Sequence, residues 1–343
     1  MRALLTDEQV MLKETVLSLA TAHGMVNPGD LSTIDRGRTW QDLADSGILA
    51  LRSTETDAAA SGVEVALVTE ALASALVPVP YLGSAVMAAE LLRLAEAPPD
   101  WTQGLDDGQR RAGVLLDPAL GALALLERAP QAVAFDAEGA DFVLCLGGTS
   151  AHPELVRLDI DAFERVNAAD LTRGVLRMTG TPRAEASLAL GDNVIDQWLA
   201  LCLVGASADI VGAMDGSLHR FVEYSKARVQ FGVPIGSFQA VQHMCAEALI
   251  STEAARSVTT YAAWAVDELD AGEALLAART AKAYASRTAR TVCETMMQCY
   301  GGIGQTWENI AHFYLRRALT SRELFGNEEV QLAEIADFRL RRA

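Results

Sequence analysis

The chain has 343 residues, 50% of them hydrophobic and 6% aromatic, which is enough for a large core and more than one folding unit. Its formal net charge of −17 argues against nucleic-acid binding, which needs clustered Lys and Arg, but it leaves room for a phosphate-bearing cofactor that needs only a local cation. The sequence shows neither a signal-peptide core nor a continuous apolar run long enough for a membrane helix, so we expect a cytoplasmic protein with no membrane partner.

The first part of the chain, residues 1–104, is predicted to be a helical domain. Thr6 and the acidic residues after it are typical of a helix start. Elsewhere in this part, apolar residues recur at intervals of three and four, which indicates helices. The predicted helices are Thr6–Leu19, one that begins at Trp40 and ends at Gly47, Val63–Leu76 and Leu82–Leu94.

The middle part, residues 105–190, has a different pattern. Short apolar runs alternate with turn residues, which is typical of a small β-domain. The runs are Gly113–Leu116, Ala132–Phe135, Phe142–Leu146, Leu155–Leu158, Val175–Met178 and Ala186–Leu190. The expected fold class is therefore α+β and mainly α, with the strands confined to this middle domain.

The last part, residues 191–343, returns to a helical pattern and is predicted to be a helical bundle. The expected helices are Val194–Tyr224, Ser237–Asp267, Glu273–Tyr300, Trp307–Leu324 and Glu328–Arg341. The third of these carries a small-residue face that allows close helix approach, made of Ala278, Ala281, Ala285 and Ala289. Several of the helices are apolar on more than one face, which predicts contacts with other subunits.

The cysteines show no spacing typical of a metal site, so no bound metal is expected. There are five of them: Cys145, Cys202, Cys245, Cys293 and Cys299. Most lie in apolar helical patterns, which predicts buried free thiols in a reducing compartment.

The most informative stretch is Tyr224–Gln239, which reads YSKARVQFGVPIGSFQ and joins two predicted helices. It places a cation at Arg228, an aromatic ring at Phe231 and an amide at Gln239 on one short connection, with Ser237 as a candidate N-cap for the next helix. A guanidinium binds phosphate in a forked geometry and an aromatic ring stacks on a flat ligand, so the set suits a dinucleotide. A plain helix end, with a C-terminal cation and a Gly stop, is the alternative.

A second stretch, Gln298–Gly304, reads QCYGGIG and closes a later long helix with a Gly pair. The pattern R-x-x-F-G-x-P-I-x-x-x-Q, followed about sixty residues later by Q-x-x-G-G-x-G, resembles the acyl-CoA dehydrogenase family, flavoproteins that desaturate acyl-CoA thioesters. The resemblance covers most of the chain and is strongest between residues 205 and 325. It implies the three-part fold predicted above and FAD as the cofactor.

In that family the two stretches contact the adenosine diphosphate half of FAD, and some of these contacts cross to the FAD of a neighbouring subunit. Carried over to this sequence, the resemblance assigns cofactor binding to Arg228, Gln230, Phe231, Phe238, Gln239, Gln298, Gly301 and Gly302. Phe238 stands where some members have a polar ring, and it cannot supply the hydrogen bond of such a ring. A simple helix C-cap is the alternative for Gly301 and Gly302.

The resemblance also implies a carboxylate base that removes the proton next to the thioester carbonyl. The two positions at which family members carry this base hold Phe325 and Cys202 here, so no catalytic residue is assigned. Glu323 and Glu328 are the acids nearest to Phe325 in sequence and are candidates for a relocated base. The alternative for Glu323 is that it is a solvated residue at a helix end, beside Arg322.

The family segments that hold the flavin ring and line the substrate entrance are altered as well. The middle domain lacks both the T-E-P-x-A-G-S-D-like loop and the W-I-T-N-like strand, and its nearest Gly pair, in Gly147–Ser150, is expected to be a turn. Near the entrance, Thr54–Thr56 stands where members usually carry P-E-x-x-G-G, which predicts an altered entrance.

Taken together, these features resemble the subunit without the catalytic base in bacterial heteromeric acyl-CoA dehydrogenases. The resemblance implies a related partner chain that bears the base, an FAD shared with that chain, an acyl-CoA substrate and an electron-transfer flavoprotein as acceptor. Several such pairs act on CoA thioesters of steroid side chains. An active homotetramer with a relocated base, and a non-catalytic scaffold with the same fold, are the alternatives.

Overall fold

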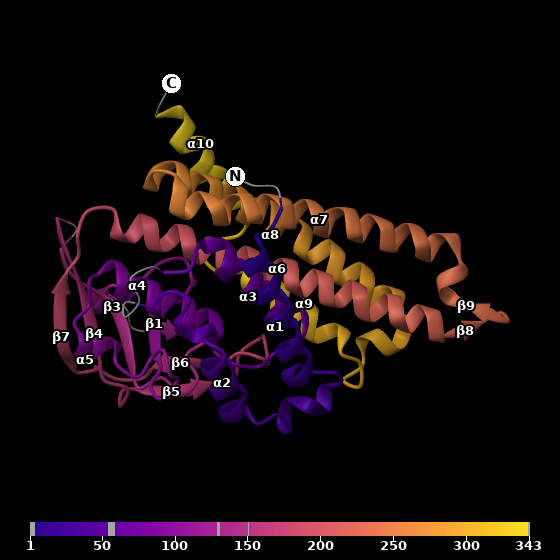
Figure 1. Cartoon of the computed structure of the whole chain (residues 1–343), viewed down its shortest axis with the longest axis horizontal. Coiled ribbons are helices and arrows are strands. Elements are labelled where there is room, and N and C mark those ends of the chain that lie inside the picture. The colour runs from indigo at the N-terminus through magenta and orange to yellow at the C-terminus, as the bar shows by residue number, and fades with distance from the viewer. Residues whose placement is uncertain (1–3, 54–58, 129–130, 150, 342–343) are drawn as a thin grey trace.

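The structure is a computed structural model that describes residues 4–53, 59–128, 131–149 and 151–341. It consists of N-terminal helices, a mixed sheet and a C-terminal bundle of long helices, and Figure 1 shows the sheet at one end of the bundle. The α+β, mainly α fold class predicted from the sequence is confirmed. The domain boundaries at residues 104 and 190 stay a prediction.

The N-terminal helices begin with α1 (Asp7–His23), whose start is explained by a capping box. The Thr6 hydroxyl accepts a hydrogen bond from the Gln9 N–H (3.2 Å), and the Gln9 side chain accepts one from the Thr6 N–H (3.1 Å). The elements that follow are α2 (Arg36–Asp45), α3 (Gly62–Ser74), the wide π-type turns η3 (Tyr81–Ala88), α4 (Ala89–Leu94) and α5 (Pro99–Thr102).

In the part of the chain that the structure describes, seven strands form one sheet in the order β5-β6-β2-β1-β3-β4-β7. They are β1 (Ala112–Leu116), β2 (Val133–Ala134), β3 (Phe142–Thr149), β4 (His152–Leu158), β5 (Phe163–Val166), β6 (Val175–Met178) and β7 (Ala184–Ala189). β1 and β3 are parallel, and the other neighbouring pairs are antiparallel. β5 has no counterpart among the predicted runs, because this edge strand carries two exposed charged residues and buries little apolar surface.

The bundle contains the five helices expected from the sequence. They are α6 (Val194–Ala227), α7 (Gln239–Glu268), α8 (Ala271–Cys299), α9 (Ala311–Glu323) and α10 (Glu328–Leu340). α9 begins at Ala311 rather than at Trp307, because the Asn309 side chain accepts a hydrogen bond from the Ala311 N–H (2.8 Å) and ends the preceding loop there. The predicted small-residue face of α8 is fully buried, which confirms its packing role.

Helix α6 is the central helix, and it packs against α3, α7, α8 and α9. Two glycines explain how α3 approaches it so closely. A Cβ added at Gly212 would lie 2.2 Å from the Glu70 carbonyl oxygen, and one added at Gly216 would lie 2.2 Å from that of Ser74. Any larger residue at either position would therefore push α3 away from α6.

By length and composition alone, α6 would also be able to cross a membrane. However, 78% of its most apolar stretch is buried inside the protein. The core of the bundle therefore accounts for this apolar helix.

A buried network of charged side chains joins the middle domain to the bundle. Arg173 donates hydrogen bonds to Asp136 (2.7 Å) and to Asp209 on α6 (2.6 Å). Arg317 on α9 donates to the same Asp209 oxygen (2.7 and 3.0 Å). Burial works to raise the pKa of Asp209, but the two guanidinium groups hold it below its ordinary value, whereas burial keeps the pKa of Asp136 raised. These ion pairs fix the sheet against α6 and α9.

Candidate cofactor and substrate site

The two sequence motifs meet at one end of the helical bundle. Tyr224, near the end of α6, lies against Tyr300, which follows α8, with the ring centroids 4.7 Å apart. Phe221 contacts the same ring at 5.2 Å. The connection after α6 and the turn η6 (Gly301–Gln305) after α8 therefore leave neighbouring helix ends, on the right of Figure 1.

The connection between α6 and α7 is a two-stranded hairpin, where the sequence predicted only a short loop. Its strands β8 (Val229–Gln230) and β9 (Val233–Pro234) are antiparallel. Phe231 and Gly232 form the turn, and both have a positive φ (+54° and +81°), as the tight two-residue hairpin turn requires. The hairpin projects from the end of the bundle (Figure 1).

Ser237 does not cap α7, which corrects the expectation from the sequence. Its hydroxyl donates to the Pro234 carbonyl instead (2.7 Å), and α7 begins at Gln239 without a side-chain cap. The hydroxyl therefore stabilises the turn that follows β9, and the helix start is left open.

All eight residues assigned to the nucleotide half of FAD are exposed at this end of the protein. They are Arg228, Gln230, Phe231, Phe238, Gln239, Gln298, Gly301 and Gly302. Phe231 is 94% exposed, and no acidic side chain among the described residues pairs with Arg228. A Cβ added at Gly301 or Gly302 would meet no atom within 4 Å, so the backbone there is open to a close approach. The free cation, aromatic ring and open backbone fit a phosphate-bearing ligand.

The two positions considered for a catalytic base are buried in apolar surroundings. Phe325 is 4% exposed and packs edge-on against Trp198, with the ring centroids 5.5 Å apart. Its N–H donates to the Leu120 carbonyl (2.7 Å). Cys202 lies in the interior of α6, where burial raises the pKa of its thiol well above the ordinary value. Neither side chain can take a proton from carbon at neutral pH.

The two acids considered as relocated bases flank the turn between α9 and α10. Glu323 is half exposed and pairs with Arg322, and Glu328 accepts a hydrogen bond from the same guanidinium (2.6 Å). Both carboxylates therefore share one cation near the surface. A relocated base at either residue stays a prediction, and this geometry adds nothing in its favour.

A further acid, which the sequence did not single out, affects the pKa of Cys202. Glu90 on α4 is 1% exposed and accepts hydrogen bonds from Arg52 (2.8 and 2.8 Å) and from Arg93 (2.9 and 2.8 Å). Burial works to raise its pKa, but these two guanidinium groups hold it below the ordinary value, and the resulting charge helps to raise the pKa of Cys202. Because both oxygens of Glu90 are engaged, this carboxylate is a structural ion pair and not a free base.

Only part of the Glu90 cluster has a signal in the sequence. Glu90 and Arg93 lie three residues apart on a predicted helix, which is the spacing of a helical ion pair. Arg52 comes from a separate loop, and no local pattern links it to Glu90.

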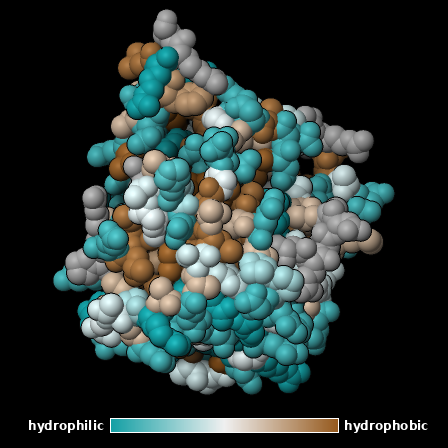
Figure 2. Space-filling model, turned by 90° about the vertical axis from the view of Figure 1, so that its left-hand side faces the viewer, coloured by the Kyte–Doolittle hydropathy of each residue, from teal (hydrophilic) through white to brown (hydrophobic). Residues whose placement is uncertain are grey.

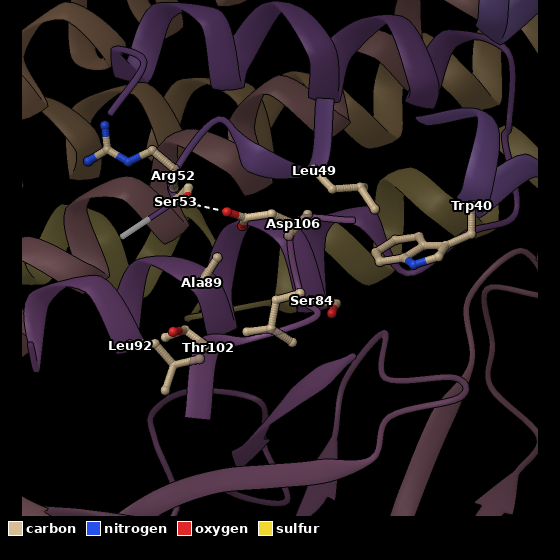
Figure 3. Close-up of a pocket in the computed structure, with 11 residues that line it drawn as sticks. Trp40, Leu49, Arg52, Ser53, Ser84, Ala89, Leu92, Thr102 and Asp106 are labelled. Atoms are coloured by element: carbon tan, nitrogen blue, oxygen red, sulfur yellow. Dashed lines mark hydrogen bonds between the residues drawn. The ribbon is translucent and has the colours of Figure 1, made fainter. Parts of the chain in front are cut away.

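A small cavity lies beside this cluster (Figure 3). Its volume is about 20 Å³, which is room for about one water molecule. It is lined by Trp40, Leu49 and Ser84 among others, and the Ser53 hydroxyl donates a hydrogen bond to Asp106 at its edge. A cavity of this size cannot hold an acyl chain. Thr54–Thr56, at the predicted substrate entrance, lies outside the described residues.

The Gly pair of the middle domain lies in a strand. Gly147 and Gly148 belong to β3 and pair with Glu154 and Pro153 of β4. The Thr149 hydroxyl accepts a hydrogen bond from the His152 N–H (3.2 Å). The expected turn at Gly147 is therefore the end of a long hairpin, and Ser150 lies outside the described residues. The loss of the flavin-ring site in this chain stays a prediction from the sequence.

Lys282 on α8 is fully buried beneath the turn that carries Phe325. Its Nζ donates to the carbonyls of Arg322 (2.7 Å) and Gly326 (2.9 Å) and to the Ser286 hydroxyl (3.1 Å). Burial lowers the pKa of Lys282 to about 7, although nearby acids oppose the shift. The Lys282 side chain therefore stabilises the turn after α9 through its hydrogen bonds, although burial disfavours its charged form.

Because of Lys282, we expect the free energy of unfolding to rise as the pH rises from 7 towards 10. Its folded-state pKa is about 7, whereas an unfolded lysine titrates near 10.4, so the unfolded chain binds more protons throughout this range. The free energy of unfolding should then rise by roughly 1 kcal/mol per pH unit. Urea unfolding at pH 7 and pH 9 measures this slope, and Lys282→Met should abolish it. An unchanged slope in that variant would contradict the assignment.

Comparisons with known proteins identify the family. The description "Acyl-CoA dehydrogenase, C-terminal domain" matches residues 195–340. Acyl-CoA dehydrogenase IpdE2 of Mycobacterium tuberculosis (strain ATCC 25618 / H37Rv) is 34% identical over 325 residues, which cover 93% of this chain and 93% of that protein. The chain therefore belongs to the acyl-CoA dehydrogenase family, as its two motifs predict.

Solved structures share the whole fold. A chain of the ChsE4-ChsE5 complex from Mycobacterium tuberculosis is similar with a TM-score of 0.80 and 25% identity, over 98% of each chain. A chain of the Tcur3481-Tcur3483 steroid ACAD G363A variant is similar with a TM-score of 0.83 and 24% identity, again over 98% of each chain. The second likeness shows the fold alone.

Proposed function

We propose that this chain is the subunit without the catalytic base in a heteromeric, FAD-dependent acyl-CoA dehydrogenase, and that it completes the FAD site of a related partner chain. The proposal depends on the difference between two regions of the chain: one keeps residues for cofactor binding, and the other has lost the catalytic base. At one end of the bundle, Arg228, Phe231, Gly301 and Gly302 are exposed and free to bind. At the turn after α9, Phe325 is buried against Trp198 where family members carry a base.

The residues of this chain would act on the cofactor through binding and orientation. FAD, when bound, supplies the redox chemistry by accepting hydride from the substrate. The Arg228 guanidinium would hold phosphate oxygens in a forked geometry, and Gln239 and Gln298 would offer amide hydrogen bonds. Gly301 and Gly302 would let the nucleotide approach the backbone, while a carboxylate of the partner chain would take the proton.

A similar solved structure and the family resemblance support the proposed assembly and substrate. The likeness to a chain of the ChsE4-ChsE5 complex supports a two-chain assembly. The proposed substrate class, CoA thioesters of steroid side chains, rests on the family resemblance of the sequence. An electron-transfer flavoprotein as acceptor and a cytoplasmic location complete the proposal.

The surface of the chain also supports a partner. Leu249, Ile250 and Tyr261 are exposed along α7. On the face that carries the sheet, Figure 2 shows a hydrophilic lower part and hydrophobic residues gathered above it. Apolar side chains on several faces suit contacts with another subunit.

Co-expression tests the proposal as a whole. We expect the chain alone to purify without bound flavin. Together with a related chain that carries the missing carboxylate, it should give a yellow complex with acyl-CoA dehydrogenase activity. Full FAD occupancy and turnover by the lone chain would overturn the proposal.

Replacing Arg228 with Ala should weaken FAD binding to that complex by about tenfold to a hundredfold, because charged hydrogen bonds to phosphate contribute about 1.5–3 kcal/mol. The dissociation constant is measured by titrating flavin-depleted complex with FAD. Lys226→Ala is the matched control, since Lys226 is an exposed cation two residues away that pairs with Glu223. Equal affinity in all three proteins would favour the non-catalytic scaffold instead.

A further inference from the structure

The loop between η6 and α9, together with the first turns of α9, carries a cluster with one exposed aromatic ring that neither sequence motif includes. Trp307 is 66% exposed, and the His312 ring meets it edge-on with the centroids 4.8 Å apart. The Arg316 guanidinium lies over the Trp307 ring, 5.3 Å from its centroid. We call these three residues the Trp307 cluster.

The Trp307 cluster is held in place by the structure around it. Arg316 donates a hydrogen bond to the Ala169 carbonyl of the middle domain (3.2 Å). The His312 ring packs against the buried Phe313, with centroids 4.5 Å apart. Turn hydrogen bonds fix the loop backbone, because the Thr306 N–H donates to the Ile303 carbonyl (3.1 Å). The exposed indole is thus ordered before any ligand arrives, which lowers the entropic cost of binding.

The position and the chemistry of the Trp307 cluster both suit an adenine nucleotide. Only Thr306 separates Trp307 from η6, which contains the open Gly301–Gly302 backbone. An indole face stacks on a purine, and stacking of this kind tolerates any flat base. Among the described residues no acid pairs with Arg316, so its charge is available to nearby phosphates.

We propose that the Trp307 cluster is the stacking platform for the adenine ring of a nucleotide bound at this end of the chain. The inference rests on the proposed function, because it places the nucleotide beside Gly301 and Gly302. Both FAD and CoA contain an adenine nucleotide, and the proximity to η6 favours the FAD held by the partner chain.

The test titrates flavin-depleted heteromeric complex with FAD and, separately, with CoA. Trp307→Ala should raise the dissociation constant for FAD about tenfold, as expected for loss of one stacked base, and Trp307→Phe should raise it less. Tyr284→Ala is the matched control, since Tyr284 is another exposed aromatic residue, in the middle of α8. It should leave both constants unchanged.

The outcomes separate the two possible sources of adenine. Weaker FAD binding alone assigns the platform to FAD, and weaker CoA binding alone assigns it to CoA; either result supports the inference. Unchanged affinity for both ligands overturns it. Loss of complex assembly by size-exclusion chromatography in Trp307→Ala also overturns it, because Trp307 would then be a protein contact. If Arg228→Ala weakens FAD binding and Trp307→Ala weakens the binding of neither FAD nor CoA, this inference fails while the proposed function stands.

Discussion

Replacing Asp209 with Ala is expected to lower the free energy of unfolding by about 3–5 kcal/mol, the usual effect of removing one partner from a buried ion pair. Asp209 is fully buried and accepts hydrogen bonds from Arg173, Arg317 and Ser321. Its removal would leave two buried guanidinium groups without the carboxylate they share. The sheet would then lose its main polar connection to α6 and α9.

Chemical unfolding of the purified protein measures this effect, with Glu164→Ala as the control. Glu164 pairs with Arg177 on the sheet surface at 2.7 Å, where both side chains are half exposed, so its loss should change the stability by less than about 1 kcal/mol. Because the folded-state pKa of Asp209 is below its ordinary value, its contribution is present at neutral pH and is lost as the pH falls below about 4. Equal losses in the two variants would show that the network does not join the domains.

Replacing Phe325 with Ala is expected to cost about 3–5 kcal/mol, the range for removing a buried phenyl ring and leaving a cavity. The ring fills the space against Trp198, and the turn around it is fixed by the hydrogen bond from the Phe325 N–H to Leu120. The variant should not gain dehydrogenase activity, because an emptied pocket still supplies no carboxylate.

The matched variant is Phe325→Leu, which keeps most of the apolar volume and should cost less than about 2 kcal/mol. Urea unfolding midpoints compare the two substitutions. A loss below about 1 kcal/mol for Phe325→Ala would mean that the ring does not fill a packed core. Turnover by Phe325→Ala alone would show that this chain keeps a usable base elsewhere.

The sequence by itself determined those features that depend on neighbouring residues. The capping box at Thr6, the long helices and the buried face of α8 follow from local patterns of polarity and size. The family follows from two motifs, in which Arg228 and the Gly301–Gly302 pair need only a short stretch of chain to be recognised.

Local preference also explains two errors. Ser237 is a good N-cap residue, but its hydroxyl finds the Pro234 carbonyl in a hairpin that the apolar pattern does not reveal. β5 is missed because an edge strand needs no apolar alternation. In both cases hydrogen bonding to the backbone of a neighbouring segment decided the local structure.

Only the tertiary structure decided which charges are buried and which side chains are free. Arg173 and Arg317 meet Asp209 across 36 and 108 residues of sequence, and Arg52 meets Glu90 across 38, so no spacing rule could have paired them. The same holds for Trp307, which looks like one more apolar residue in the sequence. Its exposure is a result of how α8 and α9 pack, because burial depends on the whole fold and not on the identity of a residue.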